Sequence, residues 1–295
     1  MRVVVAGGTG FLGSALADQL RRDGSTVTVL TRRPDRSHQI RWDPSGSTME
    51  WAHALDGADA VINLTGAPIN RRWTAAHKRE MWNSRVLATR TLVTALKSAR
   101  RIPPVFISGS AVGIYGPHGD EPVTEDTPAG SAFLASLGAA WEKEALAAGP
   151  QTRVVLVRTG IVLDRNAGAL PLMALPFRFF AGGPLGSGRQ YISWIHKDDW
   201  TAMVRWALAN AAVSGPLNVT APNPVTNLEF VRTLGRVLGR PALVPAPAFA
   251  LRLALGEMAD AVLSGQRVLP GKAQALGFDF RYPALKAALQ AIYAR

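Results

Sequence analysis

The chain of 295 residues contains no cysteine. It therefore forms no disulfide, no thiolate-ligated metal site and no cysteine nucleophile. It also lacks an apolar run of the ~18 residues that a membrane-spanning helix needs. The apolar run 3–6 stops at glycine, which is not typical of a secretory signal peptide. With 47% hydrophobic and 18% charged residues, the composition predicts a globular, cytoplasmic protein with no membrane partner.

The net charge of +12 is carried mainly by arginine, since only six of the 33 basic residues are lysine. The arginines are scattered along the chain, and no basic tract, RNA-binding aromatic motif or zinc-finger spacing accompanies them. We therefore expect a solvated basic surface and no nucleic-acid partner. An anionic small-molecule ligand is the alternative interpretation of this charge.

Short β-branched runs alternate with stretches of helical periodicity through the first half of the chain. Such alternation predicts a parallel sheet covered by helices on both faces, which is a doubly wound α/β fold. The expected strands are 3–6, 26–31, 60–64, 105–108 and 153–158, and the expected helices are 11–24, 74–99 and 131–148.

The composition changes after Asn166, where glycine, proline and aromatic residues become frequent. These residues are typical of loops and short helices. We predict two domains, a nucleotide-binding domain over residues 1–165 and a smaller substrate-binding lobe over residues 166–295. Some elements of the second are expected to return to the sheet.

A glycine-rich motif joins the first expected strand to the first expected helix. Its residues are Gly7, Gly8, Thr9, Gly10, Phe11, Leu12 and Gly13. Glycines in this context permit a tight turn and a close approach to a pyrophosphate, whose charge the helix N-terminus stabilises. The motif predicts a Rossmann-type dinucleotide site, although a glycine turn that binds nothing has the same pattern.

The end of the second expected strand distinguishes the two nicotinamide cofactors. A carboxylate at this position binds the ribose hydroxyls of NAD, whereas arginine accommodates the 2′-phosphate of NADP. This chain has Thr31, Arg32 and Arg33 there, and no acid before Asp35. The sequence therefore favours NADP(H) over NAD(H), unless the two arginines are only solvated surface residues.

At these residues the chain resembles the extended short-chain dehydrogenase/reductase superfamily, in particular its atypical "epimerase family" branch. The similarity covers nearly the whole chain, in the order of the family. The motifs that carry it are GGTGFLG (7–13), NLTG (63–66), NSR (83–85), SGSAVGIYG (108–116), RTGIVL (158–163), GGPLGSG (182–188), WIH (194–196) and LNVTAP (217–222).

The resemblance implies further cofactor contacts at the carboxyl ends of strands. Residues 64–66 would line the adenosine ribose, and residues 159–162 would lie near the nicotinamide. The helix that carries Glu80 and Arg85 would pass beneath the cofactor, where Arg85 could reach a phosphate or ribose. Alternatively, both residues are ordinary charges of a helix surface. The residues expected at the cofactor through the resemblance are Leu64, Thr65, Gly66, Glu80, Arg85, Ser108 and Val162.

The chain departs from the superfamily where the catalytic tyrosine and lysine belong. In Tyr-x-x-x-Lys the lysine lowers the pKa of the tyrosine, which then moves a proton near neutral pH. Aligned on Glu142, Leu134 replaces the tyrosine and Gly138 the lysine. A literal match at Tyr282 and Lys286 lies beyond every cofactor motif, and we interpret it as a turn into a terminal helix.

Ser110 and Tyr115 are the candidates for the missing catalytic groups. The Ser110 hydroxyl matches the superfamily's serine position with one extra residue allowed, and Tyr115 is the nearest phenol. Either side chain could instead satisfy backbone groups of its loop. His196 is expected to hold a loop before a helix that Asp198 or Asp199 would cap. No histidine or carboxylate spacing indicates a metal site.

These expectations favour an NADP(H)-dependent oxidoreductase or epimerase-like enzyme. Its substrate would be a small carbonyl or hydroxyl compound, with sugar nucleotides as one option. A catalytically reduced NADP(H)-binding sensor or regulatory protein is the alternative, because both Tyr and Lys are missing. The sequence leaves monomer and homodimer open.

Overall fold

The computed structural model describes residues 1–44 and 50–294. At its centre lies a seven-stranded sheet in the order β11-β7-β5-β4-β1-β2-β3, with every pairing parallel. This is a Rossmann-like α/β fold, as the alternation of strands and helices predicted. The strands are β1 (Arg2–Ala6), β2 (Thr26–Thr31), β3 (Gln39–Arg41), β4 (Ala60–Asn63), β5 (Val105–Ala111), β7 (Arg153–Thr159) and β11 (Gly215–Val219).

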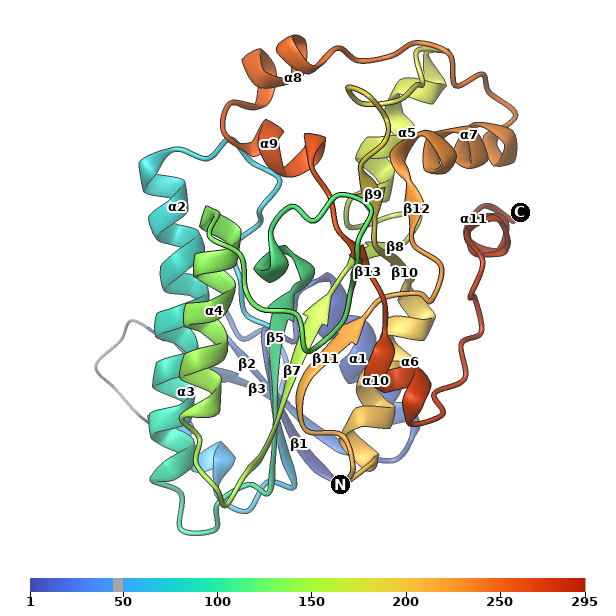
Figure 1. The fold of residues 1–295 in the computed structure, drawn as a ribbon. Coiled ribbons are helices and arrows are strands. Elements are labelled where there is room, and N and C mark those ends of the chain that lie inside the picture. The colour runs from blue at the N-terminus through green and yellow to red at the C-terminus, as the bar shows by residue number, and fades with distance from the viewer. Residues whose placement is uncertain (45–49, 295) are drawn as a thin grey trace.

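Helices cover both faces of the sheet (Figure 1). On one face, Leu16 of α1 joins the core that Trp200 of α6 forms with Val3 and Val5. On the other face, Leu92 of α3 packs in the core that contains Val4. Because successive side chains of a strand point to opposite faces, β1 contributes to both cores. The helices are α1 (Phe11–Arg22), α2 (Ala75–Trp82), α3 (Ala88–Lys97), α4 (Phe133–Leu146) and α6 (Lys197–Ala209).

A smaller lobe lies beyond the carboxyl ends of β5 and β7 (Figure 1). Its core includes Phe177, Trp194 and Phe230. Besides α6, the helices after residue 165 are α5 (Leu170–Arg178), α7 (Asn227–Leu238), α8 (Ala248–Leu255), α9 (Met258–Leu263), α10 (Gly271–Ala275) and α11 (Leu285–Tyr293). Of these, α10 packs on β11 of the central sheet. Two-stranded pairings join β8 (Ile161–Leu163) to β10 (Trp194–His196), β9 (Tyr191–Ile192) to β12 (Val225–Thr226), and β6 (Pro122–Val123) to β13 (Arg267–Val268).

The residues after 165 do not all belong to the lobe. Strand β11 pairs with β7 at the edge of the central sheet, and α6 packs beside α1. The expected helix 74–99 is observed as α2 and α3 joined by a π-helical segment, Asn83–Leu87. Two 3-10 helices, Glu50–Leu55 and Val112–Tyr115, complete the described elements. In the described part of the chain, no helix is long and apolar enough to cross a membrane.

Candidate active site

The glycine motif forms a tight turn between β1 and α1. Gly7 has a φ of +79°, and a Cβ added to it would lie 2.8 Å from the carbonyl carbon of Leu64. A Cβ on Gly13 would lie 2.2 Å from the Gly7 oxygen. Helix α1 begins after Gly10, and no side chain caps the helix there. Its first backbone N–H groups are therefore available to an anionic ligand.

The Asn63 side chain fixes the turn that follows β4. Its Oδ1 accepts hydrogen bonds from the Thr65 backbone N–H at 3.2 Å and the Thr65 hydroxyl at 2.6 Å. Its Nδ2 donates to the Thr89 hydroxyl at 2.8 Å. The turn of Leu64, Thr65 and Gly66 is thereby held against Gly7. Sequence reasoning gave Asn63 and Thr89 no role, although Asn63 belongs to a quoted motif.

The Arg85 guanidinium lies against the same turn. It donates to the Ala67 oxygen at 2.9 Å and the Met81 oxygen at 3.3 Å, and a Cβ on Gly66 would lie 2.8 Å from its Cζ. Burial lowers the pKa of Arg85 to about 10. These contacts give Arg85 a structural role beneath the turn. The Glu80 side chain is half exposed and contacts the His77 ring at 3.0 Å.

A cavity of about 310 Å³ adjoins the glycine turn. Gly8 and Thr9 form one wall, and Arg36 and His38 of the loop after β2 form another. The remaining lining residues are Ser14, Asp18, Arg21, Val29, Asp35 and Gln39. Burial lowers the pKa of His38, as do the positive charges of Arg21 and Arg36.

The structure places Arg32 and Arg33 in solvent, just beyond the end of β2. The Arg33 backbone N–H donates to the Thr31 hydroxyl at 3.4 Å. Neither arginine is among the residues that line the 310 Å³ cavity. Sequence reasoning did not single out Arg36 and His38, because they follow Pro34 in a segment without regular spacing.

At the other end of the glycine turn, the chain passes close to β8. A Cβ on Gly168 would lie 3.1 Å from the Val162 oxygen and 3.2 Å from the Phe11 ring. This contact brings the first residue of α1 beside the segment that contains Val162. Ser108, inside β5, is fully buried, and its hydroxyl donates to the Gly109 oxygen at 3.2 Å.

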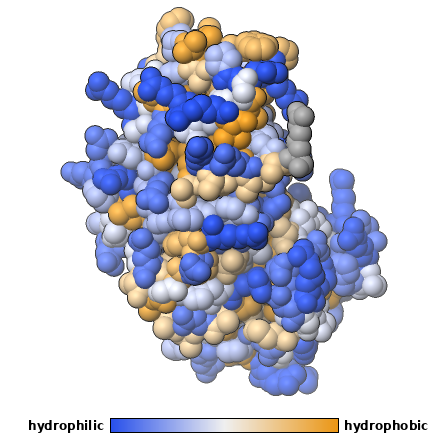
Figure 2. Space-filling view, turned by 90° about the vertical axis from the view of Figure 1, so that its right-hand side faces the viewer, coloured by the Kyte–Doolittle hydropathy of each residue, from blue (hydrophilic) through white to orange (hydrophobic). Residues whose placement is uncertain are grey.

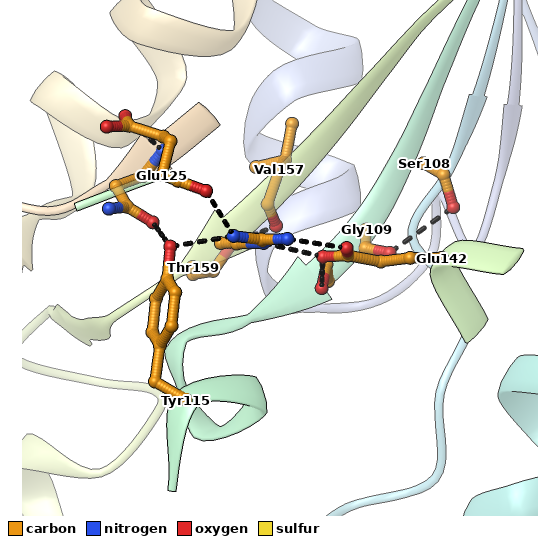
Figure 3. Close-up of polar contacts among 10 residues, drawn as sticks. Ser108, Gly109, Tyr115, Glu125, Glu142, Val157 and Thr159 are labelled. Carbon is orange, nitrogen blue, oxygen red and sulfur yellow. Dashed lines mark hydrogen bonds and ion pairs between the residues drawn. The ribbon is translucent and has the colours of Figure 1, made fainter. Parts of the chain in front are cut away.

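A buried network of polar side chains underlies the ends of β5 and β7 (Figure 3). The Arg158 guanidinium donates from Nε and one terminal nitrogen to the two Glu142 oxygens, both at 2.8 Å. The Ser110 hydroxyl donates to the same carboxylate at 2.6 Å. Arg158 also donates to the Tyr115 hydroxyl at 2.9 Å, and Tyr115 donates to Asn218 Oδ1 at 2.6 Å.

The network restricts both catalytic candidates. Tyr115 is 1% exposed, and burial raises the pKa of its phenol despite the nearby Arg158 guanidinium. Ser110 is 4% exposed, and its hydroxyl proton is directed to Glu142. The placement of Tyr115 and Ser110 favours a structural role for each hydroxyl, which was the alternative left open by the sequence.

The positions of the absent tyrosine and lysine are filled by packing. A Cβ on Gly138 would lie 3.0 Å from the Ile114 Cβ, and one on Gly113 would lie 3.3 Å from the Leu134 Cβ. Residues 112–115 form a 3-10 helix that packs directly on α4. The place of a catalytic lysine is therefore occupied by the Ile114 side chain.

A cavity of about 550 Å³ opens beside this 3-10 helix. Its nine lining residues are Tyr115, Gly116, Pro117, His118, Pro128, Ala129, Gly130, Ser131 and Ala132. Only His118 and Tyr115 of these nine carry titratable side chains. Sequence reasoning noted only that His118 lacks the spacing of a metal ligand.

His196 and Tyr282 lie together away from this cavity, with ring centroids 4.0 Å apart. His196 itself caps α6, since its Nδ1 accepts from the Asp198 backbone N–H at 3.1 Å. The expectation that Asp198 or Asp199 is the cap was wrong. The carboxylate of Asp199 instead accepts from the backbone N–H groups of Arg281 and Tyr282. Residues 1–44 and 50–294 contain no cluster suited to a metal ion.

Residues 3–220 match the NAD dependent epimerase/dehydratase family. The chain belongs to this family. Residues 246–292 match a domain of unknown function, DUF1731. Relatives of similar length include the chloroplastic epimerase family protein SDR39U1 homolog of Arabidopsis thaliana, 43% identical over 99% of this chain and 86% of its own. The epimerase family protein YfhF of Bacillus subtilis is 42% identical over 100% of this chain and 98% of its own.

Two solved structures support the same assignment. Human epimerase family protein SDR39U1 (isoform2), crystallised with NADPH, superposes with a TM-score of 0.92 at 39% identity over 99% of both chains. A nucleoside-diphosphate sugar epimerase from Corynebacterium glutamicum has a TM-score of 0.81 at 33% identity, over 98% of this chain and 57% of its own. The membership confirms the resemblance expected from the motifs.

Proposed function

We propose that this epimerase-family protein binds NADPH at the glycine turn, beside the 310 Å³ cavity. The observation that carries the proposal is the tight glycine turn, in which a Cβ on Gly7 or Gly13 would collide with neighbouring backbone. The uncapped start of α1 provides N–H groups for the pyrophosphate. The human relative that was crystallised with NADPH, and that matches 99% of this chain, supports the same cofactor.

The preference for NADPH over NADH is proposed to come from three basic residues around the 310 Å³ cavity. Arg36 and His38 line it, and Arg32 lies exposed at the end of β2 beside this loop. Guanidinium groups bind phosphate with charge-assisted hydrogen bonds, and the ribose 2′-phosphate is the group by which the two cofactors differ.

Titration of the purified protein with NADPH and NADH, followed by fluorescence, tests this assignment. We expect Arg32→Ala and Arg36→Ala each to weaken NADPH binding by about tenfold, the loss of one charge-assisted contact, with little effect on NADH. Arg22→Ala, at the end of α1, is the matched control with an exposed arginine. Equal binding of both cofactors by the unaltered protein would contradict the preference. Binding of neither would contradict the cofactor site.

We further propose that the 550 Å³ cavity takes a small carbonyl substrate, which the protein reduces to the alcohol. When bound, NADPH supplies the hydride for this reaction. His118 is the proposed proton donor to the carbonyl oxygen, because it is a titratable, half-buried side chain on the cavity wall. The lining contains no arginine or lysine, which favours a neutral compound over a nucleotide sugar.

NADPH oxidation with a panel of aldehydes and ketones tests the reductase. If His118 donates the proton, His118→Gln lowers kcat by about 100-fold, while NADPH affinity stays unchanged.

The second candidate function is that of an NADPH-responsive regulatory protein, favoured by the packing of Ile114 against Gly138. Tight NADPH binding without turnover of any carbonyl would support that second candidate and contradict the reductase.

A further inference from the structure

Large apolar side chains are concentrated at the end of the lobe farthest from the N-terminus. Thirteen such side chains are exposed in the described part of the chain, and eight of them lie between Leu172 and Leu253. Figure 2 shows this end uppermost, with apolar side chains among hydrophilic ones. The eight residues, called the apolar end here, are Leu172, Leu175, Phe179, Phe180, Leu243, Val244, Phe249 and Leu253.

Helix α8 is the clearest part of the apolar end. Seven of its eight residues are apolar, yet none is buried. Phe249 is 74% exposed and Leu253, one turn later, is 80% exposed. Apolar residues scattered singly on a surface are common, but a helix with an apolar face and no cover is not.

The second part of the apolar end is continuous in space. Leu172 and Leu175 lie one turn apart on the outer side of α5, and Phe179 directly follows the helix. The segment around Leu243 lies along the residues that follow α5, because the Val244 backbone N–H donates to the Gly182 oxygen at 3.0 Å. The same segment approaches Phe180 through Arg240, and its Leu243 is 82% exposed.

The charges around the apolar end are almost all positive. Residues 166–191 and 227–256 contain six arginines and only one acidic residue, Glu229. The Arg240 guanidinium lies 4.6 Å from the centroid of the Phe180 ring. Glu257, which precedes α9, pairs with Lys78, and Asp260 of α9 pairs with Arg252. The residues around the apolar end therefore carry a net positive charge.

We propose that the apolar end docks on an anionic lipid surface. Exposed phenylalanine and leucine side chains bordered by arginine are the pattern of protein surfaces that insert into the boundary between headgroups and acyl chains. Arginines near such a surface are attracted to anionic headgroups. A second copy of this chain is a poorer occupant, because a symmetric contact would oppose two positively charged surfaces.

This proposal goes beyond cofactor binding and does not depend on it. It also departs from the expectation of no membrane partner, which considered only spanning and signal segments. Docking by the apolar end would hold the lobe at the lipid surface with the central sheet pointing away (Figure 1).

Co-sedimentation with vesicles tests the proposal. We expect the protein to pellet with vesicles of equal parts phosphatidylcholine and phosphatidylglycerol, and much less with phosphatidylcholine alone. Phe249→Asp combined with Leu253→Asp is expected to weaken binding by at least about tenfold. Leu146→Asp, on α4, is the matched control, since Leu146 is also exposed but lies outside the apolar end. Raising the salt concentration weakens the interaction, because the arginine contribution is screened.

Three outcomes would overturn the proposal. The first is no sedimentation with anionic vesicles at low salt. The second is equal sedimentation of the control and the Phe249→Asp/Leu253→Asp variant, with thermal unfolding showing that both are folded. The third is that the unaltered protein is a dimer by light scattering and the double variant is a monomer, because the apolar end would then be the contact surface between two copies of the chain.

Discussion

Glu142 and Arg158 form a buried, bidentate ion pair, with two nitrogen–oxygen distances of 2.8 Å, that joins α4 to β7. Both side chains are less than 10% exposed. Removal of one partner from such a pair leaves an uncompensated charge in the interior, which costs far more than the loss of a surface pair.

We therefore expect Glu142→Gln to lower the free energy of unfolding by about 3–5 kcal/mol. Urea denaturation followed by circular dichroism measures this change. The control is Glu144→Gln, two residues later on the same helix, whose partner Arg90 is exposed. The control should lower stability less, since Arg90 is 59% exposed and solvent screens its pair with Glu144. Equal losses of unfolding free energy in the two variants would show that the buried pair stabilises the fold no more than the pair of Glu144 and Arg90.

Alanine substitutions at Gly13 and Gly10 of the glycine turn should have different effects on stability and on NADPH binding. A Cβ at position 13 would lie 2.2 Å from the Gly7 oxygen, whereas one at position 10 would lie 3.3 Å from that atom. Gly13→Ala should therefore destabilise the fold and abolish NADPH binding, because backbone must move. Gly10→Ala should keep nearly the original melting temperature. It should weaken NADPH binding, because Gly10 directly precedes the N–H groups of α1 that are proposed to bind the pyrophosphate. Calorimetry and cofactor titration separate the two effects.

Introducing the tyrosine and lysine of the superfamily at positions 134 and 138 should not produce carbonyl reduction by that pair. In the double variant Leu134→Tyr/Gly138→Lys, the new lysine meets Ile114, whose Cβ is 3.0 Å from where its own Cβ would be. We expect a loss of about 1–3 kcal/mol in stability from overpacking and no gain in carbonyl reduction. Adding Ile114→Ala should recover little of this stability, because alanine keeps the Cβ that the new side chain meets at 3.0 Å. A marked rise in turnover without the Ile114 change would contradict this interpretation of the packing.

The pH dependence of cofactor binding should depend on His38. Burial, Arg21 and Arg36 lower the pKa of its ring from the ordinary value, which favours the neutral ring. A bound 2′-phosphate would raise this pKa, and proton uptake would accompany binding. The affinity for NADPH should thus increase as the pH falls from about 7.5 to about 6, where the phosphate itself begins to protonate. The affinity for NADH should not change, and His38→Gln should remove the increase.

The sequence predicted the parts of the fold that depend on local pattern. The strand expected over 26–31 has those bounds, and the glycine motif lies between β1 and α1 as its context required. In both cases the pattern is short and its geometry is fixed by neighbours in the sequence.

The parts that the sequence did not predict depend on contacts distant along the chain. Tyr115 is nearest in sequence to the expected catalytic serine, but Arg158 and Asn218, which bury and bind it, come from β7 and β11. His38 adjoins the glycine turn only because β2 pairs with β1 and β3 pairs with β2 in the sheet. The spacing of apolar residues along the sequence does not indicate which distant segments come into contact.

The place of β11 has a consequence for the order of folding during synthesis. This strand covers the open edge of β7, yet it follows α5 and the first lobe strands in the chain. An amino-terminal fragment ending near residue 165 would expose the unpaired backbone of β7, and such an edge promotes aggregation. The nascent sheet therefore cannot be completed until Val219 has left the ribosome, and the lobe must begin to form before the domain that carries it is finished.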